Sequence, residues 1–357
     1  MQTRSDAVTP VAENEQADER RLTCVSCQGS VDALSRCARC GAAVRVQQYR
    51  VEALIAQHGH SRMYRARDAS GRVVALKELM FALVPSVEQL EAFEREARVL
   101  KQLGHPQTPA LIANFSVGEG VNTRLYLVQQ FVEGDTLGQR ISKRALTEAE
   151  ARDVAVQALT VLKALHGRTP KLLHRDIKPG NIIIEPSGRV MLVDFGSARD
   201  LQNSVTHGST LVGTFGYMAP EQLGGTVDET SDLFGLGATL LHAVTGVTPD
   251  QQMLHDDEPE VFRTLQVSPL FRQFLQRLTQ RKRAQRFASA TAALEFLNAG
   301  VTRRPVPRAV IIAAVGVAAV TALLTVKYAF PSQWTEYEML VGGRISEWMV
   351  QAFLGSD

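Results

Sequence analysis

The segment from Leu172 to Gly196 constrains the fold of this chain more than any other part of it. It reads LLHRDIKPGNIIIEPSGRVMLVDFG, so that polar clusters alternate with short apolar runs. The runs III and VMLV have the composition of two buried strands, and EPSGR between them is typical of a turn. Such a hairpin would bring Asn181 and Asp194 to the same end, next to a loop that carries Asp176. One site would then hold a carboxylate suited to act as a base and an Asn/Asp pair suited to Mg²⁺, which prefers oxygen ligands.

This segment resembles the catalytic loop and the metal-binding loop of eukaryotic-type (Hanks-type) protein kinases. Both H-R-D-x-x-x-x-N and D-F-G are unbroken, and the two motifs in this order are much harder to obtain by chance than an ordinary polar turn. The resemblance implies that Asp176 accepts the proton of a substrate hydroxyl and that Lys178 steadies the γ-phosphate of ATP. It also implies that Asn181 and Asp194 hold Mg²⁺ on ATP, so that ATP and Mg²⁺ are the expected cofactors.

Two upstream residues extend the resemblance into a small β-rich lobe. Residues 49–79 alternate in the manner of strands, and the run Val-Ala-Leu-Lys that ends at Lys77 matches the strand whose lysine contacts the α- and β-phosphates. Residues 87–103 carry apolar side chains on one helical face, and on this helix Glu96 matches the glutamate that pairs with the strand lysine. A strand lysine or a helix glutamate alone would mean little, but the order of the motifs favours the functional interpretation.

The glycine-rich loop is the place where the sequence departs from the kinase pattern. The expected G-x-G-x-x-G falls on residues 56–61, where Ala56, His58 and Ser61 occupy the three glycine positions and only the neighbouring Gly59 remains. Glycines there let backbone N–H groups approach the phosphates without a Cβ in the way. Ala and Ser are small, but His58 would place a bulky ring on the turn over the nucleotide, where it could donate to a phosphate or obstruct one.

The segment 125–134 resembles the last strand of the small lobe and the hinge that follows it. Gln129 then occupies the gatekeeper position, and residues 130–132 form the hinge, whose backbone would bond to adenine. This assignment rests on the apolar pattern and makes Gln130 and Val132 contacts of the nucleotide.

The loop after Asp-Phe-Gly and the motif that ends it indicate the class of substrate. Kinases with an arginine before the catalytic aspartate, as Arg175 is here, are commonly activated by a phosphate in this loop. The loop offers the hydroxyls of Ser204, Thr206, Ser209 and Thr210. Residues 213–221, GTFGYMAPE, resemble the substrate-docking loop of protein kinases, and together with Lys178 they favour serine or threonine over tyrosine as the acceptor. The implied partners are protein substrates, and a homodimer for autophosphorylation is allowed.

The resemblance also implies two structural anchors in the large lobe. Asp232, at the start of an apolar helix, would cap the backbone of the catalytic loop. Arg286 would pair with Glu221, the last residue of the docking loop. Neither anchor would take part in the chemistry itself.

The four cysteines of the chain form a paired C-x-x-C pattern, Cys24/Cys27 and Cys37/Cys40. Two residues between cysteines let both thiolates reach one tetrahedral Zn²⁺, and two such pairs complete its four ligands. The spacer is shorter than the commonest one, but the pattern resembles small zinc ribbons. A redox dithiol pair is the weaker alternative, because no thioredoxin-like unit surrounds the cysteines. With four thiolates the zinc would be structural, and the ribbon is expected to be a docking knob.

Residues 309–330 are predicted to form a transmembrane helix. The stretch 309–326 has no charged residue, and about twenty apolar residues span a bilayer. Arginines of the basic linker 301–308 precede it, whereas Lys327 and acidic residues follow it. By the positive-inside rule the kinase domain would be cytoplasmic and the short tail 331–357 extracytoplasmic, as in a single-pass protein of the cytoplasmic (inner) membrane.

The N-terminus and the overall charge add few constraints. Residues 1–20 are polar and are predicted to be a disordered tail, without the apolar h-region of a signal peptide. The formal net charge of +2 gives no electrostatic argument for nucleic acid, so no nucleic-acid partner is expected.

We therefore predict an α+β, two-lobed protein kinase fold over residues 49–300, preceded by a zinc ribbon at 21–45 and followed by one transmembrane helix. The predicted function is that of a membrane-anchored Ser/Thr protein kinase. The alternative is a pseudokinase that scaffolds partners at the membrane through the ribbon, which only the altered glycine-rich loop supports. A zinc-dependent nucleic-acid binder is disfavoured, because no basic surface interleaved with aromatic residues is visible around the cysteines.

Overall fold

The computed structural model of the chain describes residues 22–31, 36–58, 60–80, 87–200, 214, 216–252 and 260–299. Residues up to Asn298 belong to one unit, and a second unit begins at Ala299. The predicted terminal tails, the basic linker, the span 309–330 and the four activation-loop hydroxyls all lie outside the described residues. Within the residues that are described, every helix is too short or too polar to cross a membrane.

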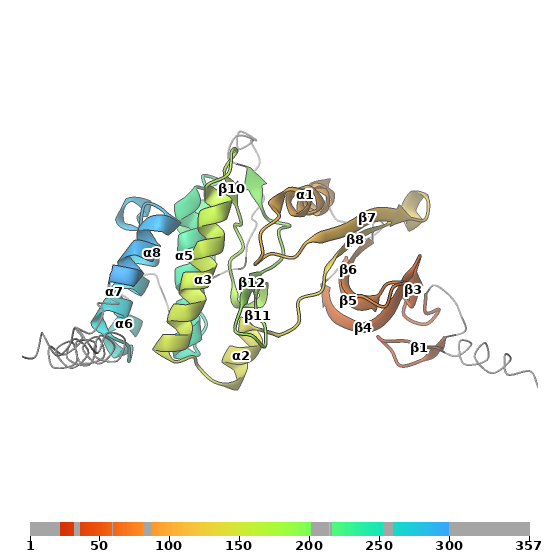
Figure 1. Ribbon diagram of the computed structural model, residues 1–357, viewed down its shortest axis with the longest axis horizontal. Helices are drawn as coiled ribbons and strands as arrows, with labels where there is room; N and C mark the ends of the chain where they lie inside the picture. The colour runs from red at the N-terminus through yellow and green to blue at the C-terminus, as the bar shows by residue number, and fades with distance from the viewer. Residues whose placement is uncertain are drawn as a thin grey trace, which may run out of the picture. The chain divides into compact units, whose positions relative to one another are not determined.

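An antiparallel sheet forms the N-terminal lobe, with the strand order β3-β4-β5-β6-β8-β7 (Figure 1). The strands are Arg45–Val46 (β3), Tyr49–His58 (β4), Ser61–Arg67 (β5), Val73–Met80 (β6), Leu111–Val117 (β7) and Arg124–Gln130 (β8). The helix of this lobe, α1, covers Val87–Leu103 as the apolar periodicity predicts. The curl of the sheet is visible in Figure 1 at β4 and β5.

Side chains alternate between the two faces of this sheet, as the period of two requires. On β5 the buried Tyr64 is flanked by less buried neighbours on either side. Cross-strand pairing places Leu76 opposite Tyr64 and places Lys77 opposite Met63. Side chains of adjacent residues on β6 therefore lie on opposite faces of the sheet. Lys77 lies on one face, and Leu76 and Glu78 lie on the other.

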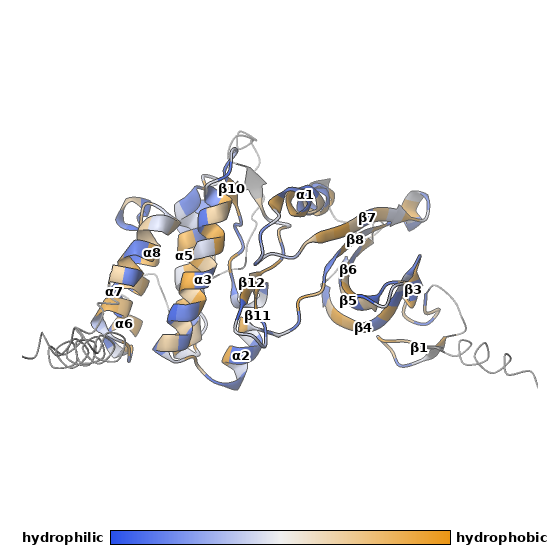
Figure 2. Ribbon diagram, in the orientation of Figure 1, coloured by the Kyte–Doolittle hydropathy of each residue, from blue (hydrophilic) through white to orange (hydrophobic). Residues whose placement is uncertain are grey.

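The C-terminal lobe consists mainly of helices. They are Leu137–Lys143 (α2), Glu148–His166 (α3), Pro220–Leu223 (α4), Glu229–Thr245 (α5), Val261–Thr264 (α6), Pro269–Leu278 (α7) and Ala290–Ala299 (α8). Figure 2 shows hydrophilic and hydrophobic stretches alternating along α3, as an amphipathic helix requires. The capping box predicted at its start is confirmed, since Thr147 accepts from the Glu150 amide and the Glu150 side chain accepts from the Thr147 amide. By contrast α5 is buried over most of its length, because its sequence is apolar on every side.

The remaining elements are short strands and 3-10 helices, several of which surround the predicted catalytic segment. The strands are Asp135–Thr136 (β9), Leu172–Leu173 (β10), Ile182–Ile184 (β11), Val190–Leu192 (β12) and Arg199–Asp200 (β13), and the 3-10 helices are Gly120–Asn122, Pro179–Asn181 and Arg283–Gln285. The predicted hairpin is confirmed: β11 and β12 pair antiparallel, with Ile182 opposite Leu192. The second strand ends one residue earlier than the apolar run. At the N-terminal end of the described chain, Leu22–Thr23 (β1) pairs with Ser30–Val31 (β2).

Candidate active site

Three charged residues from three elements meet between the sheet and the hairpin. Lys77 of β6 donates from Nζ to Glu96 Oε2 of α1 at 2.6 Å and to Asp194 Oδ1, after β12, at 3.1 Å. Burial alone would lower the pKa of Lys77, but the charges of Asp194 and Glu96 reverse this effect and raise it, so the lysine stays charged. The charge of Lys77 in turn lowers the pKa of Asp194 to about 2, although burial acts in the opposite direction. The lysine and both carboxylates predicted to organise ATP are thus in contact.

The hairpin explains why Asn181 and Asp194 lie at one end of the site. The Val193 amide donates to the Asn181 carbonyl at 3.0 Å, directly beyond the paired strands. Asp194 then adopts a positive φ of 64°, which turns its side chain out of the strand direction. A Cβ added at Gly196 would lie 3.4 Å from Asp194 Oδ1 and 3.5 Å from Glu96 Oε2, in ordinary van der Waals contact with both carboxylates.

The donor set fits a hard divalent cation. Asp194 is ionised and partly exposed, and the side-chain nitrogen of Asn181 makes its hydrogen bonds, which leaves the amide oxygen as its coordinating atom. A carboxylate and an amide oxygen are ligands that Mg²⁺ accepts, usually together with substrate phosphates and water.

The predicted base, Asp176, is held by three side chains. Lys178 Nζ lies 2.8 Å from its Oδ2, and Asn181 Nδ2 donates to the same oxygen at 3.0 Å. Thr214 donates its hydroxyl to Asp176 Oδ1 at 3.3 Å and accepts from Lys178 Nζ at 2.7 Å. The docking-loop motif alone does not predict this role of Thr214. The available signal was a hydroxyl residue beside the glycine that begins the motif.

The backbone of the catalytic loop is anchored by Asp232 of α5, as predicted. The amides of His174 and Arg175 donate to its two carboxylate oxygens at 2.9 and 2.7 Å. Burial would raise the pKa of Asp232, but its hydrogen bond to His166 and the neighbouring positive charges lower it, so that it remains an acceptor. Arg175 has a positive φ of 67°, and the double anchor from Asp232 holds this unusual backbone in place.

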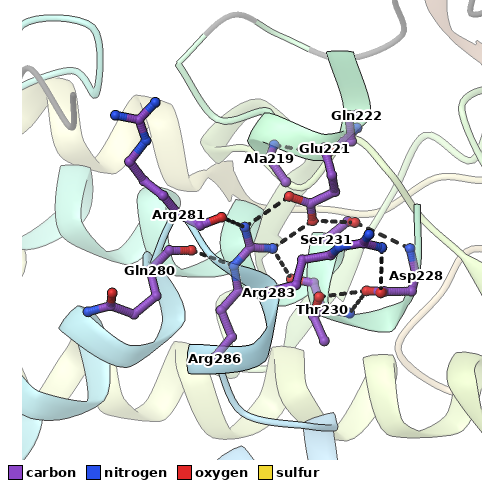
Figure 3. Close-up of polar contacts among 10 residues, drawn as sticks. All are labelled: Ala219, Glu221, Gln222, Asp228, Thr230, Ser231, Gln280, Arg281, Arg283 and Arg286. Carbon is purple, nitrogen blue, oxygen red and sulfur yellow. Dashed lines mark hydrogen bonds and ion pairs between the residues drawn. The ribbon is translucent and has the colours of Figure 1, made fainter. Parts of the chain in front are cut away.

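The docking-loop motif is tied to the lobe by the predicted pair of Glu221 and Arg286. Arg286 donates from Nη1 and Nη2 to the two oxygens of Glu221 at 2.6 and 2.9 Å, and Figure 3 shows this double contact. Its remaining bonds go to the backbone carbonyls of Thr230, Gln280 and Arg281. Ser231 donates to Glu221 Oε1 at 2.7 Å. The Arg286 side chain is fully buried, and these bonds satisfy the donors of its guanidinium.

At the position of the expected glycine-rich loop, β4 and β5 pair antiparallel. The backbone of His58 ends β4 and pairs with Ser61, the first residue of β5. The side chain of His58 lies outside what the structure describes. Ala56 pairs with Met63, and a register shift just before it bends β4. Burial lowers the pKa of His60, and the charge of Lys77 adds to this effect.

The predicted hinge begins where β8 ends. Gln129 is buried, as a gatekeeper would be, and Gln130 is exposed. The Gln130 amide donates to the Ala110 carbonyl at 2.8 Å, so this amide is already bonded within the protein, and the adenine contact at Val132 stays a prediction. Val132 itself is buried.

The four cysteines converge at a second site. Their sulfur atoms all lie within 4.8 Å of one another, with Cys24 Sγ 3.5 Å from Cys40 Sγ and Cys27 Sγ 3.6 Å from Cys37 Sγ. Sulfurs at about 2.3 Å from a tetrahedral Zn²⁺ would be about 3.8 Å apart, so the cluster fits this ion.

The two cysteine pairs have the same backbone geometry. The Cys24 amide donates to the Gly29 carbonyl and the Cys37 amide donates to the Ala42 carbonyl, five residues later in each case. The turns end on positive φ angles at Gln28 and Gly41. This repeated turn aims both sulfurs of each pair to the same side, as a metal knuckle requires.

Comparisons with known proteins agree with this geometry. A model of the protein kinase domain matches residues 49–299. The chain is 34% identical over 277 residues to serine/threonine-protein kinase PknA of Nostoc sp., which covers 72% of this chain and 48% of that protein. It is 32% identical over 281 residues to serine/threonine-protein kinase C of Synechocystis sp., with 73% and 51% covered. It is 35% identical over 208 residues to serine/threonine-protein kinase PknA of Mycobacterium tuberculosis, with 57% and 48% covered.

The chain spans about half the length of these curated relatives. The matched region contains both lobes, the lysine–glutamate–aspartate contact and the whole catalytic loop. The chain therefore belongs to the protein kinase family.

Proposed function

We propose that this chain is a Ser/Thr protein kinase that transfers the γ-phosphate of ATP to hydroxyl groups of proteins. The observation that carries the proposal is the double contact of Lys77 with Glu96 and Asp194. In protein kinases this lysine–glutamate pair and the metal-binding aspartate must both be in place for transfer. A scaffold without activity would not need all three groups to meet.

Each residue has a distinct role in this mechanism. Lys77, positioned by Glu96, binds the α- and β-phosphates of ATP. Asp176 accepts the proton of the substrate hydroxyl as the hydroxyl oxygen attacks the γ-phosphorus, and the bond from this phosphorus to the β-phosphate oxygen breaks so that ADP leaves. Lys178 neutralises charge on the transferred group.

Two residues of the same site would hold the metal ion. Asn181 and Asp194 would hold Mg²⁺, which supplies charge neutralisation and orientation to the phosphates when it is bound. Thr214 links the docking loop to the base through its contacts with Asp176 and Lys178, and the docking loop together with Lys178 favours serine or threonine as the acceptor.

Transfer of labelled phosphate from ATP tests the proposal directly. We expect the purified chain with Mg²⁺ to label itself or a generic Ser/Thr substrate. Asp176→Asn should reduce this labelling to background, since the amide cannot accept the proton. Asp153→Asn, at an exposed position of α3, is the matched control and should retain full labelling. Failure of the wild-type chain both to bind ATP and to transfer phosphate would instead favour the pseudokinase scaffold.

The cysteine cluster is proposed to hold one structural Zn²⁺. Its support is the spacing of the four sulfurs and the repeated knuckle geometry. Four thiolates fill a tetrahedral shell and leave no position for a substrate. The ion would therefore stabilise the ribbon and take no part in phosphate transfer.

We also propose that residues 309–330 anchor the kinase to the cytoplasmic membrane, with the kinase domain on the cytoplasmic side. The support is the uncharged stretch 309–326 within it and the arginines before it. The full chain is expected to sediment with membranes and to be released by detergent, whereas a chain that ends before Arg303 should stay in the supernatant. Full-length protein that stays in the supernatant without detergent would refute the anchor.

A further inference from the structure

The cysteine ribbon contacts the outer face of the kinase sheet, the face opposite Lys77. The Ala43 amide donates to the hydroxyl of Tyr64 at 3.2 Å, and Arg62 Nη2 donates to the Cys40 carbonyl at 3.2 Å. Ala43 and Val46 join the buried cluster of this face, together with Tyr64. The strand β3 continues from the ribbon into the sheet by pairing with β4. The ribbon is thus packed as part of the small lobe.

A buried carboxylate lies at the centre of this contact. Glu78 is fully buried and directly follows Lys77 on β6. It accepts hydrogen bonds from the hydroxyls of Tyr64 at 3.0 Å and Tyr126 at 2.9 Å. Burial raises the pKa of Tyr64 to about 12, which keeps this phenol a donor. A carboxylate in such a place needs a cation, because two neutral hydroxyls do not compensate for its lost hydration.

Arg36 of the ribbon supplies the closest cation. Its Nη2 forms an ion pair with Glu78 Oε1 and contacts the Tyr126 hydroxyl, while its Nη1 donates to the Gly41 carbonyl at 2.8 Å. The guanidinium of Arg124 lies farther away, at 3.7 Å from Glu78. The planar guanidinium of Arg36 therefore joins the ribbon to β6 through two separate nitrogen atoms.

The position of Arg36 depends on the fold of the second knuckle. Arg36 directly precedes Cys37, and Gly41 directly follows Cys40, so the bond from Arg36 to the Gly41 carbonyl spans the whole metal-binding turn. A backbone bridge between Arg36 and Ala43 spans the same turn. A metal bound in this turn would therefore also fix the direction of the Arg36 side chain.

We infer that Arg36 and Glu78 are positioning residues for the kinase reaction, through which the metal-bound ribbon holds the strand that carries Lys77. The inference rests on the proposed kinase function and deepens it. Loss of Arg36 or of the metal would leave Glu78 buried without its nearest cation. The strand β6 would then shift to hydrate this carboxylate, and Lys77, as its neighbour, would no longer bind the phosphates of ATP in the same place.

The test is a cycle of variants in the full-length chain, with MgATP affinity measured by calorimetry. Arg36→Met is expected to weaken ATP binding about tenfold, within the range of coupling between residues in contact. In a Glu78→Gln background the same change should cost less than about twofold, because no buried charge is left to compensate. Arg39→Met, an exposed arginine in the same knuckle, is the matched control and should bind ATP like the wild type.

Two further measurements distinguish a positioning role of Arg36 from a general loss of stability. Amide hydrogen exchange of residues 73–80 should accelerate in Arg36→Met and not in Arg39→Met. In Arg36→Met the KM for ATP should also rise more than kcat falls.

Removal of zinc tests the role of the metal. The zinc is chelated, the chelator is dialysed away and Mg²⁺ is restored. The zinc-free protein should then lose ATP affinity to the same degree as Arg36→Met.

The outcomes are distinct for the two proposals. Equal losses from Arg36→Met in the wild-type and Glu78→Gln backgrounds, or unchanged affinity in Arg36→Met or in the zinc-free protein, would overturn the positioning role and leave the kinase proposal standing. A wild-type chain that does not bind ATP at all would overturn both.

Discussion

Replacing Asp194 with alanine is expected to reduce phosphate transfer by at least about a thousandfold, because a lost metal ligand removes several kcal/mol of charge stabilisation. The carboxylate binds Lys77 directly and is the strongest candidate ligand for Mg²⁺ in the site. The fold should survive, since the side chain is partly exposed and Lys77 keeps its contact with Glu96. Initial rates with labelled ATP and urea unfolding of the same preparation measure both effects.

A surface pair provides the control for Asp194→Ala. Asp135 forms an exposed ion pair with Lys143 at 2.7 Å. Asp135→Ala also removes an aspartate–lysine contact, but it should leave the transfer rate within about twofold of wild type, because exposed pairs contribute little. Undiminished turnover in Asp194→Ala would show that the assignment of this site is wrong.

The largest stability effect is expected from Arg286→Met. This change keeps an unbranched side chain at the buried position but removes the guanidinium that neutralises Glu221. Removing one partner of a buried ion pair costs about 3–5 kcal/mol. Arg286 is fully buried and Glu221 nearly so, so neither group can regain water without moving the docking loop. Denaturant unfolding monitored by circular dichroism should show the loss as a lower midpoint.

Arg283 offers a matched comparison in the same cluster (Figure 3). It forms an ion pair with Asp228 at 3.0 Å, but its side chain is 43% exposed. Arg283→Met should therefore change the free energy of unfolding by less than about 1 kcal/mol. If Arg286→Met proved as mild as Arg283→Met, the buried pair would not be the anchor of the docking loop.

Motifs with fixed spacing made the catalytic segment predictable. The hairpin, the contact of Lys77 with Glu96, and the anchors Asp232 and Arg286 all form as the sequence indicates. These features are predictable because each depends either on the local pattern of apolar residues or on a residue that its place in a family motif identifies.

The contacts of the ribbon could not be predicted in the same way. Motif spacing indicated a metal knuckle, but which surface the knuckle contacts depends on long-range packing that no local period encodes. One signal was present: Glu78 falls on the strand face of Val74 and Leu76, where an apolar residue is expected. A charge at a buried position of a strand requires a partner from elsewhere in the chain. Arg36, beside a cysteine, was available to provide it.

The pairing of β3 with β4 limits how far the chain can be truncated from its N-terminus. The family match begins at Tyr49, the first residue of β4, so a truncation chosen from that boundary would remove β3 and the whole ribbon. The start of β4 would become an open sheet edge, and Tyr64, Tyr126 and Glu78 would lose the cover of the ribbon. Open edges beside newly exposed aromatic residues favour aggregation. The shortest catalytic fragment that does not aggregate should therefore start at or before Leu22, well upstream of the first residue of the family match.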